Sequence, residues 1–157
     1  MKTILLLIGK TDNKHYVAGI NDYAERVSHY IPFDITVLPD IKNTKNMSEQ
    51  QQKEKEGEMI CDFLRPGDIV VLLDEHGKEQ RSLEFAKWVE KKLASSAKRL
   101  VFIIGGPYGF SQKVYDQAND MISLSKMTFS HQMVRLIFVE QLYRAMNILG
   151  GGAYHHE

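Results

Sequence analysis

Short apolar runs alternate with longer amphipathic stretches along the whole chain. The runs are bounded by Gly, Pro or Asp, a pattern typical of β-strands that end in turns. The strands predicted from them are Thr3 to Ile8, Phe33 to Leu38, Ile69 to Leu73, Leu100 to Ile104 and the shorter Met121 to Leu124.

The stretches between these runs have the period of helices. They predict helices over Lys14 to Tyr30, Ser48 to Leu64, Ser82 to Ala97, Ser111 to Asn119 and His131 to Leu149. Ser48 with Gln51 forms a capping-box pattern, and Ser82 followed by Glu84 predicts a capped start for the next helix.

Two of the runs, IVVLL and LVFII, are apolar at every position. A strand with one face in solvent would alternate apolar and polar residues, so we expect these strands to be covered on both faces. The sequence therefore predicts an α/β fold with a mainly parallel sheet and helices on both sides. At 157 residues the chain suits a single hydrophobic core, and we expect one domain over residues 1–157.

The predicted last helix is apolar nearly all round. One stripe comprises Val134, Phe138, Leu142, Ala145 and Leu149, and the other side carries Met133, Leu136, Ile137 and Tyr143. Such a helix is buried from two directions, and the sheet of its own chain covers only one of them. We therefore predict a homodimer with this helix in the interface.

Composition narrows the class of protein. Lys and Arg number 20, as do Asp and Glu, so the net charge of zero does not indicate a nucleic-acid partner. The single cysteine, Cys61, excludes an internal disulfide, and no Cys/His cluster has zinc spacing, so we expect a cytoplasmic protein without a metal. The apolar run Ile4 to Ile8 is too short for a signal sequence, and no run approaches a membrane span.

Three segments that follow predicted strands carry candidate chemistry: LLDEHGK, IIGGPYG and SLSKMTFSHQ. Ligands of parallel α/β sheets bind at the carboxyl ends of the strands, so these segments form one pocket if the three strands are adjacent. The glycine segment lacks the dinucleotide fingerprint, and the chain has no Walker lysine, so NAD and ATP are disfavoured.

Each segment also has a purely structural interpretation. Asp74, Glu75 and His76 are an acid/base or metal group, or else a turn with Gly77 at positive φ. The glycines form a ligand-binding loop or a tight turn. In the third segment a hydroxyl caps the helix, which leaves Ser125, Lys126, His131 and Gln132 unexplained.

Several segments together resemble one known family: LLDEHGKEQRSLEFA, FIIGGPYG, SLSKMTFSHQMVR, EQLYRAMNI and the closing AYHHE. They are similar to the bacterial ribosomal RNA large subunit methyltransferase H family, SPOUT-class enzymes that methylate N3 of a pseudouridine in 23S rRNA. The resemblance covers the whole chain. It implies a C-terminal trefoil knot that general topology rules would argue against. It also implies a homodimer, S-adenosylmethionine bound in the knot, and the assembled ribosome as substrate.

Carried over to this sequence, the implied cofactor site falls on Leu73, Gly106, Ser125, Lys126, Met127, Thr128, Phe129 and Ser130. In this interpretation the strand stops at Ser125 because the loop offers backbone groups to adenine and ribose, while glycines leave room for the ligand. We expect Gly106→Leu to fill the adenine pocket and abolish binding.

Methyl transfer to an imide nitrogen needs near-attack geometry. It also needs a base that removes the N3 proton, or a cation that stabilises the negative charge on the carbonyl oxygens. By position the candidates are His155 with Tyr154 from the tail and Arg144 for a phosphate or carbonyl, with His131 weaker. Without the resemblance, Arg144 is a helix-surface ion-pair partner of Glu140, and the tail is a disordered end.

This chain departs from the family pattern at two positions. Ser130 stands where proline is common, and it supplies an N-cap hydroxyl instead. His156 stands where Lys or Arg is usual, which weakens the tail's charge. Local phosphate contacts are expected among Lys10, Lys14, Lys126, Arg135 and Arg144. The alternatives are a SPOUT enzyme acting on tRNA, a non-catalytic ribosome-associated module and a flavodoxin-like nucleotide binder.

Overall fold

The computed structural model describes residues 1–156. In chain order its elements are β1 (Lys2–Ile8), α1 (Lys14–Ser28), β2 (Phe33–Leu38), η1 (Thr44–Asn46), α2 (Glu49–Phe63), β3 (Ile69–Glu79), α3 (Ser82–Leu93), β4 (Arg99–Ile104), α4 (Gln112–Gln117), β5 (Asp120–Ser123) and α5 (Met133–Leu149). Every predicted strand and α-helix is present. The short 3-10 helix η1 was not predicted.

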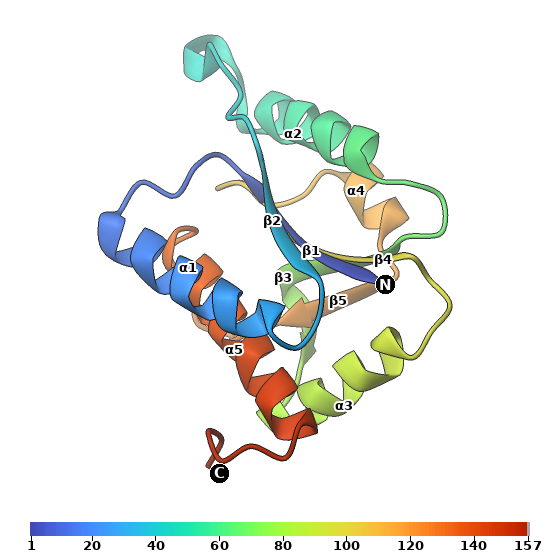
Figure 1. Ribbon diagram of the computed structural model, residues 1–157. Coiled ribbons are helices and arrows are strands. Elements are labelled where there is room, and N and C mark those ends of the chain that lie inside the picture. The colour runs from blue at the N-terminus through green and yellow to red at the C-terminus, as the bar shows by residue number, and fades with distance from the viewer. Residues whose placement is uncertain (157) are drawn as a thin grey trace.

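The five strands form one sheet in the order β2-β1-β4-β3-β5, and every neighbouring pair is parallel. Helices α1, α3 and α5 pack together on one face, while α2 and α4 pack together on the other (Figure 1). This confirms the predicted α/β fold with helices on both sides. The trefoil knot stays a prediction.

The continuous apolar runs are explained by two cores, one on each face of the sheet. In β1, Leu5 and Leu7 belong to the core beneath α1, α3 and α5, while Leu6 and Ile8 belong to the core beneath α2 and α4. All six residues of β4 are buried. A strand of this kind has no solvent-facing position, which is why its sequence does not alternate.

β3 is longer than predicted, because it continues through the residues that were read as a turn. Leu73 and Lys78 both pair with Ile122 of β5, so residues 74–77 form an irregular excursion between two paired segments. Gly77 does not have a positive φ, and that part of the turn interpretation is wrong. A Cβ on Gly77 would lie 2.6 Å from the backbone nitrogen of Ile122, so the close approach of β5 requires glycine there.

Helix ends differ from the predictions where side chains find other partners. The capping box of α2 is confirmed, since Ser48 and Gln51 exchange hydrogen bonds. α3 instead follows Arg81, whose backbone N–H donates to Glu84, and the Ser82 hydroxyl donates to Gln141 of α5. The predicted Ser82 cap is therefore wrong, and this hydroxyl joins two helices.

The apolar helix α5 lies between α1 and α3 of its own chain. A Cβ on Gly19 of α1 would lie 2.9 Å from the Leu136 side chain, so glycine allows these two helices to approach closely. Neighbouring helices thus cover much of the surface that we assigned to a partner subunit, and the homodimer stays a prediction. Within residues 1–156, neither α5 nor another helix is long and apolar enough to cross a membrane.

Arg135 fastens α5 to the end of β1. Its side chain is 1% exposed, and it donates hydrogen bonds to the carbonyls of Ile8 and Gly9 and to the Thr11 hydroxyl, at 2.7 to 2.9 Å. The expectation that Arg135 contacts phosphate is therefore wrong. Its charge is used to satisfy backbone acceptors where the first strand ends.

Replacing Arg135 by Met should lower the free energy of unfolding by about 3 kcal/mol, because it leaves buried acceptors without donors. Denaturant unfolding of the purified protein measures this loss. Arg65→Met, at an exposed arginine, is the matched control and should leave the unfolding midpoint unchanged. Equal effects of the two substitutions would contradict the role given to Arg135.

Candidate functional site

A cleft of about 1140 Å³ opens at the carboxyl ends of β3, β4 and β5. These strands are adjacent in the sheet, and the three segments singled out in the sequence all line the cleft. The expectation that they meet in one pocket is confirmed. The first turns of α2, at residues 48–50 and 53, form a further wall that sequence reasoning missed.

The glycine segment after β4 forms a tight turn in one wall of the cleft. Gly109, with φ +80°, donates its backbone N–H to the carbonyl of Gly106 at 3.2 Å. A Cβ on Gly106 would meet the carboxyl oxygens of Glu56 at 2.5 and 2.6 Å. An added side chain therefore collides with Glu56 behind the turn. The expectation that Gly106→Leu abolishes cofactor binding stays a prediction, and the contact with Glu56 adds a second reason for it.

The segment after β5 curls over the cleft and is held by its own hydroxyls. Ser125 Oγ accepts the backbone N–H of Met127 at 2.9 Å, and Ser130 Oγ accepts that of Met133 at 3.0 Å. Ser130 thus provides the capping hydroxyl expected at the start of the last helix. Thr128 and Phe129 line the cleft beside them.

Two polar residues of this segment face away from the cleft, and one faces it. The Lys126 side chain is 87% exposed, lies 3.7 Å from the Glu79 carboxylate and does not line the cleft. Gln132 accepts the N–H of Asp12 and donates to the carbonyl of Lys10, so it ties α5 to the β1–α1 connection. His131 lines the cleft.

Asp74 lies in the cleft just after Leu73 and has three hydrogen-bond donors. The Tyr115 hydroxyl, the backbone N–H of His76 and the His76 ring all bind its carboxylate. Burial raises the pKa of Asp74, but the hydrogen bonds from Tyr115 and His76 outweigh it and lower the pKa overall. Asp74 is therefore ionised, and its carboxylate is held in place by hydrogen bonds from three donors. Among the described residues, no group of three or more His, Cys, Asp or Glu side chains could hold a metal.

The three proposed catalytic residues form a cluster at the other end of α5. The Arg144 guanidinium donates to Glu140 at 2.6 and 3.1 Å, lies 3.0 Å from His155 Nδ1 and stacks over the Tyr154 ring. The Tyr154 hydroxyl lies 3.0 Å from both Glu140 and the Tyr23 hydroxyl. The tail that could have been a disordered end is thus packed against two helices.

The protonation states in this cluster follow from its hydrogen bonds. A guanidinium only donates, so His155 Nδ1 accepts, and the proton of the neutral ring is on Nε2. Burial, then Tyr23 and Glu140, raise the pKa of Tyr154, which keeps the phenol neutral. The Tyr154 hydroxyl donates to Glu140, and Nε2 of His155 is buried. Arg144 uses three of its five N–H groups on Glu140 and His155, and its other two can bind an oxygen that carries negative charge.

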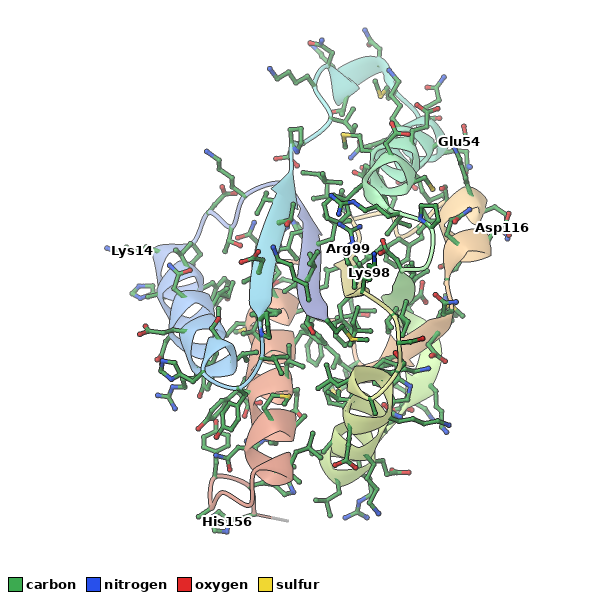
Figure 2. All side chains as sticks on the ribbon, turned by 45° about the vertical axis from the view of Figure 1, so that its right-hand side comes forward. Lys14, Glu54, Lys98, Arg99, Asp116 and His156 are labelled. Carbon is green, nitrogen blue, oxygen red and sulfur yellow. The ribbon has the colours of Figure 1, made fainter. Side chains whose placement is uncertain are left out.

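The cluster and the cleft are separate within one chain. None of Arg144, Tyr154 and His155 lines the cleft. Arg144 follows Met133 by eleven positions, which corresponds to about 16 Å along a helix. Figure 2 shows His156 at the far end of α5, remote from Lys14, which begins the helix after the carboxyl end of β1.

Comparison with known proteins agrees with this architecture. A family model described as predicted SPOUT methyltransferase matches residues 1–155. Among solved structures, a probable methyltransferase from Bordetella pertussis Tohama I has a TM-score of 0.57 and 9% identity, with 92% of this chain and 94% of that chain covered. A probable methylase family protein from Haemophilus influenzae Rd KW20 has a TM-score of 0.53 and 13% identity, covering 99% and 70%. These two similarities concern the fold alone.

Curated relatives are much closer in sequence. The protein of Bacteroides fragilis strain YCH46 named "Ribosomal RNA large subunit methyltransferase H" is 68% identical over 157 residues, covering 100% of both chains. The protein of the same name from Flavobacterium johnsoniae is 55% identical, again over 100% of both chains. The resemblance found in the sequence motifs is therefore confirmed, and the chain belongs to the ribosomal RNA large subunit methyltransferase H family of SPOUT methyltransferases.

Proposed function

We propose that this protein uses S-adenosylmethionine to methylate N3 of a pseudouridine in 23S rRNA of the assembled ribosome. Identity of 68% to relatives named for large-subunit rRNA methylation supports the RNA class. The observation that carries the chemistry is the cleft that all three motif-bearing segments line. The named nucleotide, the ribosomal substrate and a cytoplasmic location come from the family resemblance and belong to the proposal.

The residues of the cleft fit a nucleoside cofactor. The volume of about 1140 Å³ exceeds the range usual for drug-sized ligands, so both the cofactor and a target base have room. Leu73, Gly106 and residues 125 and 127–130 would hold the cofactor through backbone groups and apolar contacts. Lys126, whose side chain faces away, would contribute through its backbone alone.

S-adenosylmethionine supplies a methyl group already activated on a sulfonium, so the protein's task is positioning and charge stabilisation. Removal of the N3 proton would place negative charge on N3 and the flanking carbonyl oxygens. The N3–C bond would then form as the methyl C–S bond breaks, and neutral S-adenosylhomocysteine would leave. Arg144 is the donor suited to those oxygens, because two of its five N–H groups remain after the contacts with Glu140 and His155. This assigns the tail the role of positioning Arg144, with solvent or His131 as the proton acceptor.

The distance between the cleft and the tail cluster gives a reason to expect a homodimer in which the two chains share each site. Because Arg144 lies about 16 Å along α5 from the cleft end, the tail of one chain does not reach its own cofactor. An antiparallel arrangement of two α5 helices would bring each cluster to the cleft of the partner. In this proposal the dimer is therefore required for turnover.

A chain with zero net charge is better suited to binding the assembled ribosome than to binding naked RNA. Zero net charge gives little of the phosphate attraction that drives nonspecific RNA binding. An enzyme that recognises the assembled ribosome gains contacts from shape and from ribosomal proteins. Local cations such as Lys10, Lys14 and Lys126 would then only position the RNA.

Methyl transfer from labelled S-adenosylmethionine to intact ribosomes, separated subunits, naked rRNA and tRNA tests the proposal. We expect label at a single pseudouridine of large-subunit rRNA, and only from ribosomes. Label in tRNA would move the protein to another branch of SPOUT enzymes. Cofactor binding without label in any of the four substrates would favour a non-catalytic module.

Gly106→Ala should weaken S-adenosylmethionine binding at least tenfold, because the methyl group collides with Glu56 and displaces the turn in the cleft wall. Isothermal titration calorimetry measures the affinity. Gly67→Ala is the control for general destabilisation, since alanine is strained at the φ of +85° of Gly67 but this residue lies outside the cleft. Unchanged affinity of Gly106→Ala would remove the turn from the cofactor site.

Deleting residues 153–157 should leave cofactor affinity unchanged and reduce turnover at least a hundredfold, because the deletion removes the Tyr154 and His155 contacts that hold Arg144 without touching the cleft. Mixing this variant with Gly106→Leu chains should restore activity, since one mixed dimer contains an intact cleft facing an intact tail. Activity measured on ribosomes before and after subunit exchange provides the readout. Failure of the mixture to recover activity would argue against a shared site.

A further inference from the structure

Glu56 is a buried acid that the proposed reaction does not use. It lies on α2, is 3% exposed, and receives one hydrogen bond, from Gln52 to Oε2 at 3.3 Å. Its Oε1 is buried and has no hydrogen-bond partner within residues 1–156. A half-satisfied buried carboxyl costs stability, so its presence calls for a compensating role.

Its position indicates where that role lies. The carboxyl oxygens lie 2.5 and 2.6 Å from the position that a Cβ of Gly106 would take, so the acid is packed directly behind the glycine turn of the cleft wall. Lys53, one helical turn earlier on α2, lines the cleft itself. Glu56 is therefore separated from the cofactor cleft by the thickness of one backbone segment without a side chain.

The surroundings leave the charge of Glu56 uncompensated. Burial raises its pKa, the hydrogen bond from Gln52 lowers it, and Asp40, which follows β2, raises it. The glycine turn faces it from the β4 side with backbone only, and Gln52 faces it from its own helix. Negative potential from such a group is weakly screened and extends into the neighbouring cleft.

We propose that the Glu56 carboxylate makes the cleft prefer the positively charged methyl donor over the neutral product. This inference rests on the proposed function. S-adenosylmethionine and S-adenosylhomocysteine share every group except the methyl on sulfur and the positive charge that accompanies it. A buried negative charge behind the cleft wall distinguishes them by that charge, and so favours release of the product after transfer.

The proposed preference predicts that affinity for the donor depends on pH. A cation in the cleft stabilises ionised Glu56, so donor binding releases a proton in the pH range where free Glu56 is protonated. Affinity for the donor therefore rises with pH through this range. Affinity for the product does not, because its sulfur is uncharged.

Calorimetric titration of the full-length dimer with both ligands between pH 5 and 8 tests this. In the wild type the ratio of product Kd to donor Kd should rise about fivefold over this range. In Glu56→Gln the ratio should be independent of pH and as low as that of the wild type at pH 5. Glu58→Gln, an exposed glutamate on the same helix, is the matched control and should behave as the wild type.

Thermal unfolding provides an independent readout. Because the folded-state pKa of Glu56 is raised, its ionisation opposes folding once the pH exceeds that pKa, and has no effect below the unfolded-state pKa. Glu56→Gln should therefore raise Tm at pH 8 and leave it unchanged near pH 4. A variant that is more stable but discriminates less well would separate a functional charge from a packing role.

Three results would overturn the inference. The ratio of affinities could be independent of pH in the wild type. It could keep its pH dependence in Glu56→Gln. The substitution could also weaken both ligands equally, which would make Glu56 a packing residue. If wild-type protein binds neither ligand, the proposed function itself fails, and that outcome is recognised before any variant is compared.

Discussion

The hydrogen bonds from Arg135 to the end of β1 fix the start of the last helix, and the segment that curls over the cleft leads into that helix. A fully buried guanidinium is unusual, and here it satisfies carbonyls that a strand leaves open as it ends. Gln132 adds a second link to the same connection. With the start of α5 fixed, the segment that precedes it has to pass over the carboxyl ends of β3 and β4. The cleft is the consequence.

Local patterns were sufficient for the layers of this fold, because strands covered on both faces have no polar positions. They failed where one part of the chain approaches another. Gly77 looked like a turn glycine, yet it is required by the backbone of β5, a neighbour more than forty residues away in sequence. Ser82 looked like a cap, and its partner is on α5. Arg135 looked like a surface cation, because the carbonyls that it binds at the end of β1 are far from it in the sequence.

In the candidate site, too, the features that follow from local patterns were predicted and those that depend on tertiary contacts were missed. The three loops of the cleft were found from strand ends and motifs, since each carries polar residues or glycines that a core does not need. Tyr115, Glu56 and the first turns of α2 were missed, because their roles arise only from tertiary contacts. No spacing between residues indicated that Arg144 and the tail would lie apart from the cofactor residues. That separation depends on the direction of a single helix.

Loops in such a chain tolerate changes of length. Helix α5 does not, because Arg135 holds one end against β1 and Tyr154 holds the other end against Tyr23 of α1.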